Sequence, residues 1–356
     1  MAVGESLRRN SISNKTHWNA LVLVPTIQLK DQFKEEFIKW GYEDILYAVI
    51  FTCYQTAYKI EDHHYNVVVC DEIHLGLSTE YRKFFEQNTY DRLLCVTATV
   101  PEDDEYAKYL SSLAPVVYNI SLDECIKLGF VSPYNIVCVS VKLTSQEKEE
   151  YDRAQKLFLY YKYELGQFDA FNEANRIMNS KNSNPQEKKN AIMFYRSIKS
   201  RKNVVDNATN KITILQKVVL NNLQKKILAF GGNNAFTDKM CQAIEPLGVT
   251  YHSNLTKKQR NLSLEKFNDG TKNVLCSTKA LNQGFNVEGA EIGIICGLTS
   301  KALTMIQRIG RLLRYKENKI GKIVIVYVAD SQEDKWLKNA IKKFKNVKYI
   351  DDIKKI

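Results

Sequence analysis

VVVCDEIH, residues 67–74, is an apolar run that ends in two carboxylates and a histidine. A continuous apolar run of this kind predicts a strand buried on both faces, as in a parallel sheet covered by helices. In open α/β sheets, ligands bind beyond the carboxyl ends of the strands. Asp71 placed there can hold a hydrated Mg²⁺, and Glu72 can orient a water for attack on a γ-phosphate. The alternative interpretation is an acidic strand end that only opens a loop.

Similar apolar runs recur on both sides of this stretch, separated by amphipathic segments of helical period. The runs before residue 126 are LVLVPT (21–26), ILYAVIFT (45–52) and LLCVTAT (93–99). Those after residue 220 are KILAF (226–230), GVTYH (248–252), NVLCS (273–277), IGIIC (292–296) and KIVIVYVA (322–329). This alternation predicts two α/β lobes, each built on a parallel sheet.

The segment between the two groups of strands has a different composition. Residues 145–220 are polar and basic, and TSQEKEEYDRAQKLF predicts a helix with Thr144 or Ser145 as its N-cap. The stretch NSKNSNPQ (179–186) predicts a turn or loop. We therefore predict three parts along the chain. These are a first lobe over 1–125, a connector with a helical insertion over 126–220, and a second lobe with a basic tail over 221–356.

The positive charge is concentrated in two segments of this chain of net charge +11. Residues 181–226 carry 11 Lys or Arg and 2 acids, and residues 335–356 carry 8 Lys and 2 acids. A basic balance of this kind favours a polyanionic partner such as DNA or RNA. The alternative is a solvated helix face and an irregular tail.

One stretch of the basic connector interleaves cations with aromatic residues. KKNAIMFYRSIKSRK (188–202) contains Phe194 and Tyr195, as a groove with base-stacking aromatics would. An amphipathic helix explains the pattern equally well, and it is the interpretation we favour. Its inward-facing residues would be Ile192, Met193, Tyr195 and Ile198.

Composition excludes several other classes of protein. The eight cysteines show no CxxC spacing or zinc pattern, so we predict buried, reduced thiols. No apolar run approaches the ~20 residues that span a bilayer. No apolar segment of a signal peptide follows the first residues. These features predict an intracellular protein without membrane contact. High Lys and Asn content is typical of an AT-rich genome, viral, phage or bacterial.

QRIGRLLR, residues 307–314, carries the second chemical signal. Gln307, Gly310, Arg311 and Arg314 stand at i, i+3, i+4 and i+7, which places them on one helical face. Two arginines on one face suit a forked clamp on phosphate oxygens. Arginine supplied across a cleft stabilises the charge that develops in phosphoryl transfer. The alternative is an arginine-rich surface helix.

Together, these stretches resemble the motifs of superfamily 2 helicases of the DEAD/DEAH-box type, with DExH proteins and phage or restriction helicases as relatives. The resemblance runs through nearly the whole chain, in the family's order. The matching stretches are VPTIQLKDQF (24–33) for motif Ia, FTCYQTAYK (51–59) for the motif Ib neighbourhood, DEIH (71–74) for motif II, TAT (97–99) for motif III, KILAFGG (226–232) for motif IV, YHSNLTKKQR (251–260), FNDGTKNVLCSTKALNQGFNV (267–287) for motif V and QRIGRLLR for motif VI.

The resemblance implies two tandem RecA-like lobes and an ATP hydrolase that uses ATP and Mg²⁺ and binds DNA or RNA. Asp71 would bind Mg²⁺, and Glu72 would position the water. The other nucleotide-site residues would be His74, Gly284, Asn286, Gln307, Arg311 and Arg314. Thr97 and Thr99 would couple the lobes. The nucleic-acid track would include Pro25, Thr26, Thr52 and Thr278, which hold phosphates without reading bases.

The chain departs from the family pattern at its start. It contains no G-x-x-x-x-G-K-S/T, and Lys15-Thr16 lacks the preceding glycines. AVGESLRR (2–9) resembles the helix that follows the phosphate loop in this family. We therefore expect an N-terminally truncated, incomplete first lobe without its first strand and P-loop, and poor ATP hydrolysis by this chain alone. A second departure is Asn286, where many relatives carry Asp.

These expectations favour an ATP-dependent helicase or translocase, with DNA as the preferred substrate. A non-catalytic nucleic-acid-binding remnant is the alternative, as is a fragment that works with a missing N-terminal piece. A translocase subunit of a larger assembly would use the same motifs.

Overall fold

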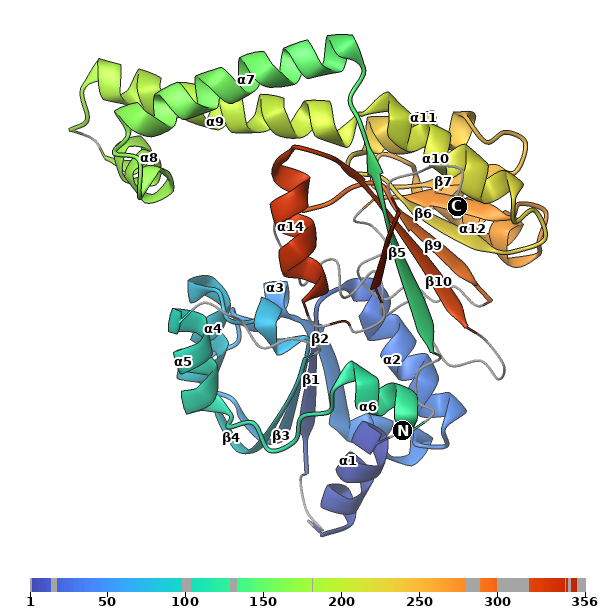
Figure 1. Ribbon diagram of the computed structural model, residues 1–356. Helices are drawn as coiled ribbons and strands as arrows, with labels where there is room; N and C mark the ends of the chain where they lie inside the picture. Colours follow the sequence, from blue (N-terminus) through green and yellow to red (C-terminus); the bar gives the residue numbers. More distant parts are fainter. Residues whose placement is uncertain are drawn as a thin grey trace. The chain divides into compact units, whose positions relative to one another are not determined.

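This computed structural model describes residues 2–13, 18–97, 104–128, 133–180, 182–278, 289–299, 320–342, 344 and 347–350. The chain divides into two compact units, whose described residues lie before and after the boundary between Ser121 and Leu122. Each unit contains one parallel sheet, as the sequence predicts (Figure 1).

The first unit is a four-stranded sheet with helices on both faces. Its strands are β1 (Ala20–Val24), β2 (Val49–Cys53), β3 (His64–Asp71) and β4 (Thr89–Val96). Its helices are α1 (Ala2–Ser13), α2 (Ile27–Lys39), α3 (Tyr54–Ala57), α4 (Thr79–Gln87) and α5 (Asp104–Leu113), with 3-10 turns at Glu43–Ala48 and Ile73–Leu75. The strand order is β2-β1-β3-β4, and every pairing is parallel.

The two faces of this sheet form separate apolar cores. Val22 and Val69 pack on one face with residues of α1 and α2, including Leu7 and Phe37. On the other face, residues such as Val68 pack with helices α4 and α5. All five residues of β1 are buried, because neighbouring strands and both helical layers surround it. The four strands predicted before residue 126 are confirmed.

The second unit is built on a seven-stranded parallel sheet. Its strands are β5 (Tyr134–Val141), β6 (Ile227–Phe230), β7 (Gly248–Tyr251), β8 (Val274–Ser277), β9 (Ile292–Ile295), β10 (Gly321–Val328) and β11 (Val347–Ile350). Its helices are α6 (Leu122–Lys127), α7 (Ser145–Glu164), α8 (Ala170–Asn179), α9 (Pro185–Asp206), α10 (Thr209–Leu220), α11 (Asn234–Gln242), α12 (Lys257–Asn268) and α14 (Gln332–Ile341). The strand order is β11-β5-β10-β9-β6-β8-β7.

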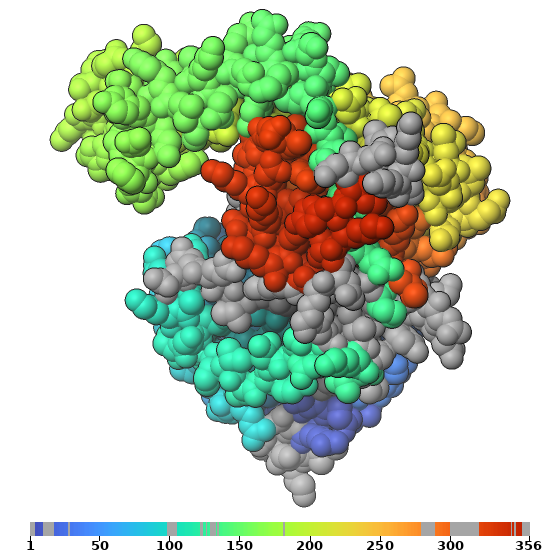
Figure 2. Space-filling view, viewed as in Figure 1, coloured from blue at the N-terminus to red at the C-terminus, as the bar shows by residue number. Residues whose placement is uncertain are grey.

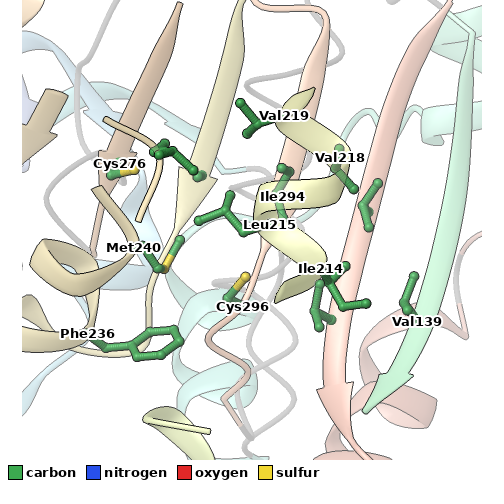
Figure 3. Close-up of a cluster of buried hydrophobic side chains, with 14 of the residues drawn as sticks. Val139, Ile214, Leu215, Val218, Val219, Phe236, Met240, Cys276, Ile294 and Cys296 are labelled. Carbon is green, nitrogen blue, oxygen red and sulfur yellow. The ribbon is translucent and has the colours of Figure 1, made fainter. Parts of the chain in front are cut away.

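Helices α10 and α11 close one face of this larger sheet. Leu215 from α10 and Met240 from α11 meet the sheet residues Ile294 and Cys276 in one buried cluster (Figure 3). Six of the eight cysteines are buried, as predicted, whereas Cys95 and Cys125 are only partly buried.

Two strands and one helix of the second unit were not predicted. β5 lies within the stretch assigned to the connector, yet it pairs along its whole length with β10. β11 lies within the segment 335–356 that was treated as a basic tail, and it pairs with β5. α14 overlaps the start of the same segment.

Helices α7, α8 and α9 form an arm with a small core of its own (Figures 1 and 2). Thr144 caps α7 through a capping box, which confirms the predicted start of that helix. The favoured amphipathic helix over 188–202 is also confirmed, but its inward face differs from the prediction. Tyr195 and Ile198 pack against this core as predicted, whereas Ile192 is 38% exposed and Phe194 is fully buried with Ala191. A buried Phe194 is inaccessible to a stacking base.

Several cations of the basic connector have structural partners. Arg201 lies over the ring of Phe158, 4.1 Å from its centroid, and Lys202 pairs with Asp206. Lys211 is fully buried and donates to Glu333 Oε1 at 2.8 Å. The positive balance of 181–226 therefore overstates the charge that this segment presents to a polyanion. Across the part of the chain that is described, no helix combines the length and apolar character that crossing a membrane requires.

Candidate active site

The acid pair predicted from the sequence stands at the carboxyl end of β3. β3 lies between β1 and β4, and its central residues are buried, so Asp71 is the first residue to emerge from the sheet. The Tyr54 hydroxyl donates to the Asp71 backbone oxygen at 2.8 Å, which ties the strand end to α3. Both carboxylates are half-buried at the edge where parallel sheets bind ligands.

The backbone turns sharply directly after Asp71. Glu72 adopts a left-handed conformation with φ 50° and ψ 51°, which costs a non-glycine residue roughly 1–2 kcal/mol. Strain of this kind persists only where the surrounding structure holds it, and it concentrates at functional sites. The turn lets Glu72 and Asp71 present their side chains at one strand end.

His74 joins the acid pair to the end of the neighbouring strand. Its Nδ1 lies 3.2 Å from Glu72 Oε2 and 3.0 Å from the Oγ1 of Thr97, the residue that follows β4. The imidazole is almost fully buried. Three residues predicted from two motifs are thereby brought together within the first unit.

The acid pair carries negative charge in a partly dry environment. Burial, together with the adjacent Glu72 carboxylate, raises the pKa of Asp71 to about 6, against smaller opposing effects of a backbone hydrogen bond and His74. Two neighbouring carboxylates at a strand end fit the oxygen ligands that Mg²⁺ prefers, and a bound cation would relieve their repulsion. The described residues contain no cluster of three or more His, Cys, Asp or Glu side chains that could hold a metal. Any Mg²⁺ here would thus take its remaining ligands from water and phosphate, as Mg²⁺ commonly does.

The predicted track residues of the first unit lie at the same edge of the sheet. Pro25 and Thr26 follow β1, and Thr52 lies one residue before the end of the adjacent β2. Thr26 Oγ1 accepts a hydrogen bond from Leu29 N at 3.3 Å and caps α2. Gln55 Nε2 donates to the Pro25 oxygen at 3.2 Å, which fixes the loop between β1 and α2.

Thr278 belongs to the second unit and follows β8. It is buried, and its Oγ1 donates to Asn234 Oδ1 at 2.9 Å at the start of α11. Asn234 also donates to Ser253 Oγ at 3.3 Å, so the loops that follow β6, β7 and β8 are tied together at the carboxyl edge.

Sequence reasoning missed two residues that support these positions. Tyr54 lies within the stretch 51–59 but was given no role, and Asn234 lies outside the matched stretches, because their roles depend on contacts with residues 17 and 44 positions away. The remaining predicted site residues lie outside the described residues: Thr99, Gly284, Asn286, Gln307, Arg311 and Arg314.

Two family models match the chain, one in each unit. The model described as "Type III restriction enzyme, res subunit" matches residues 5–102, which include the acid pair. The model "Helicase conserved C-terminal domain" matches residues 210–316. The matched ranges include Asp71 and Thr278 respectively, the two places where the structure gathers polar side chains at a strand end.

Curated relatives match over different lengths. The chain is 26% identical over 320 residues to "DNA 3'-5' translocase XPB2" of Sulfurisphaera tokodaii, which covers 86% of this chain and 71% of that protein. It is 29% identical over 93 residues to "ATP-dependent rRNA helicase RRP3" of Scheffersomyces stipitis, which covers 25% of this chain and 19% of the relative.

Solved structures share the fold at low identity. The Hef helicase domain of Pyrococcus furiosus superposes with a TM-score of 0.57 at 14% identity, covering 92% of this chain and 90% of that one. The S. cerevisiae Dbp5 structure bound to RNA and ADP BeF3 also gives 0.57 at 14% identity, covering 94% and 78%. The tandem RecA-like architecture is therefore confirmed.

Proposed function

The chain belongs to superfamily 2 of the helicases, an ATP-hydrolysing family, and on that basis we propose that it is the motor core of a translocase that moves along DNA. The observation that carries the proposal is the strained strand end at which Asp71, Glu72, His74 and Thr97 converge. DNA is the proposed substrate because the relative that covers most of the chain is a DNA translocase.

Bound ATP and Mg²⁺ would supply the reacting phosphate and the charge that neutralises it. Asp71 would hold the cation through its carboxylate. Glu72 would orient the attacking water and accept its proton, and His74 would keep the Glu72 carboxylate in place. Thr97 would transmit a change at His74 to the residues that follow β4.

The other predicted residues complete this proposal. Gln307, Arg311 and Arg314 would act on the phosphates from the second lobe, with Gly284 and Asn286 lining the nucleotide site and Thr99 coupling the lobes. Pro25, Thr26, Thr52 and Thr278 would hold the nucleic-acid backbone. The corresponding division is a first lobe over 1–125, a connector with insertion over 126–220 and a second lobe over 221–356. The motor would act inside the cell, and the Lys- and Asn-rich composition fits a phage or viral origin.

The 356 residues contain no glycine-rich phosphate loop, so we propose that this chain alone hydrolyses ATP poorly. Such a loop neutralises the β- and γ-phosphates through backbone N–H groups and a lysine. The same observation favours a second candidate function, a non-catalytic nucleic-acid-binding protein that works with a partner.

Strand binding and ATP hydrolysis test these functions separately. We expect the chain to bind single-stranded or duplex DNA with an affinity that falls as salt rises, and Thr52→Ala, at a partly buried track position, to weaken binding about fivefold through loss of roughly 1 kcal/mol. Hydrolysis should be negligible until a strand and phosphate loop are fused ahead of Ala2, and should then be stimulated by DNA and abolished by Glu72→Gln.

Each result has a distinct meaning. DNA binding by a fused chain that still fails to hydrolyse ATP would favour the non-catalytic function. Absence of salt-dependent DNA binding would contradict both functions.

A further inference from the structure

Two cysteines lie side by side on adjacent strands of the first unit, directly before the acid pair. Cys70 of β3 is paired in register with Cys95 of β4, and Asp71 is the next residue of β3. Register partners on neighbouring strands point to the same face of a sheet. On the face that α4 and α5 cover, Cys70 belongs to the buried core and Cys95 packs against it. The proposed function uses neither thiol.

The spacing of the two residues suits a disulfide. Neighbouring strands lie about 4.8 Å apart, and the Cα atoms of disulfide partners are usually about 4.4–6.8 Å apart. Both cysteines are free thiols in this structure. Their side chains already interact, with the Cys70 thiol as hydrogen-bond donor and the Cys95 sulfur as acceptor. A bond between them therefore requires no rearrangement of the sheet.

The two thiols differ in their access to solvent. Cys70 is fully buried, whereas Cys95 is only partly buried. An oxidant in solution would therefore react with Cys95 before Cys70. An accessible cysteine beside a second cysteine is common among thiols that sense oxidation, because the second thiol converts the first oxidation product into a disulfide.

We propose that Cys95 and Cys70 form a reversible disulfide when a peroxide reaches the protein, which makes them a modification site directly before Asp71. With hydrogen peroxide, the Cys95 sulfur attacks one oxygen and the O–O bond breaks, which gives a sulfenic acid and one water. The Cys70 sulfur then attacks the Cys95 sulfur. The S–O bond breaks, and the hydroxyl leaves as a second water with the Cys70 proton. The two thiols lose two electrons, which reduce the peroxide.

The bond would join β3 and β4 at the position that precedes the acid pair. Asp71 follows Cys70, and Thr97, which contacts His74, lies two residues beyond Cys95. A covalent link there limits how far the two strand ends can separate. In the proposed function, His74 and Thr97 transmit changes between these strand ends, so oxidation would restrict that transmission. This consequence rests on the proposed function, whereas formation of the bond does not.

Peptide mapping without reductant tests the inference on the full chain. After treatment with hydrogen peroxide and alkylation of the remaining thiols, we expect two peptides joined through Cys70 and Cys95. Dithiothreitol should restore both thiols, because disulfides exchange with free thiols.

Three single variants assign the role of each thiol. In Cys70→Ser, Cys95 should stop at the sulfenic acid, which a dimedone probe traps, because no neighbouring thiol converts it further. In Cys95→Ser, Cys70 should stay reduced, because it is fully buried. Cys125→Ser is the matched control, since Cys125 is also partly buried, and it should leave the yield of the disulfide unchanged. Circular dichroism should show all three variants folded.

Hydrogen exchange measures the effect of the bond on the strand end. The amides of Leu75 and Gly76 donate within the turn that follows Asp71. We expect their exchange to slow at least about twofold on oxidation, because the link opposes local opening of the strand ends. An unchanged rate would show that the bond does not restrict this turn.

Three outcomes would overturn the modification site. The first is no link between Cys70 and Cys95 at a peroxide concentration that oxidises Cys125. The second is a link from Cys95 to another chain. The third is as much dimedone adduct on Cys95 in the wild type as in Cys70→Ser. DNA binding by the reduced chain tests the proposed function separately, so failure of the disulfide and failure of that function are distinguishable.

Discussion

Asp71 at the end of β3 and Glu333 in the first turn of α14 are both carboxylates withdrawn from water, in different units. Glu333 is fully buried, accepts from Lys211 Nζ at 2.8 Å and from Val328 N at 2.7 Å, and so has a cation and a backbone donor. Among the described residues, no lysine or arginine forms an ion pair with Asp71. An acid that is paired with a cation joins structural elements. An acid without such a partner at a sheet edge is available to a ligand.

The strands that hold these acids differ in the same way. Seven of the eight residues of β10 are buried, between β5 and β9. In β4 no residue is fully buried. This interior strand of the larger sheet is therefore closed, whereas this edge strand of the smaller sheet is accessible. Three substitutions test whether this contrast is reflected in the stability of the folded protein.

The largest effect is expected from Lys211→Met. This variant leaves Glu333 buried without its cation, and breaking a buried pair in this way costs about 3–5 kcal/mol. Burial already raises the pKa of Glu333, with Lys211 opposing that shift, so the lone acid would take up a proton more readily. Urea unfolding at neutral pH measures the loss.

The matched control replaces both partners, Lys211→Met with Glu333→Leu. The double variant should recover much of the stability, because no unpaired charge remains. A single variant that unfolds like the wild type would show that Glu333 does not depend on Lys211, and the contrast with Asp71 would fail.

Asp71→Asn is expected to have a smaller effect of opposite sign. Because folding raises the pKa of Asp71 from 3.8 to about 6, the ionised acid destabilises the folded state. That penalty is absent below pH 3.8, grows as pH rises and is complete above pH 6. The variant should therefore be more stable by about 1–2 kcal/mol at pH 8, allowing for partial exposure, and unchanged near pH 4.

Thermal melts with EDTA across this pH range check the prediction, since any bound cation would mask the repulsion. Glu72→Gln is the informative companion, because it removes the neighbouring charge but keeps Asp71. If Asp71→Asn were less stable than the wild type at pH 8, the Asp71 carboxylate would have a favourable partner in the folded state. Asp71 would then resemble Glu333 instead of contrasting with it.

The parts of the fold that sequence predicted are those that depend on local pattern. The apolar runs around 21–26 and 67–70 became strands because only burial on both faces suits such runs. The location of Asp71 and Glu72 followed from one strand end. By contrast, the contact of His74 with Thr97 depends on how β3 and β4 align, which no single motif encodes.

The parts that were missed depend on distant partners or were obscured by composition. β5 follows a short helix and precedes a polar arm, and its partner β10 begins almost two hundred positions later. The Lys-rich end of the chain was treated as a tail, although α14 buries Leu337, Ala340 and Ile341 there and β11 pairs with β5. Phe194 was left out of the predicted inward face and Ile192 was included, because the run from Ile192 to Tyr195 is apolar throughout and does not show which residues face inward.

The smallest effect is expected from Val96→Lys on the free edge of β4. Val96 is 45% exposed and lies outside both cores of its sheet, so a flexible lysine can reach water while keeping the strand paired to β3. We expect a change within about 0.5 kcal/mol, as for most exposed positions. Ile50→Lys on β2 should behave alike in urea unfolding.

If Val96→Lys instead cost more than about 1 kcal/mol while Ile50→Lys did not, something would already cover the β4 edge. The β4 edge would then be closed, and its accessibility could not explain why no described lysine or arginine pairs with Asp71.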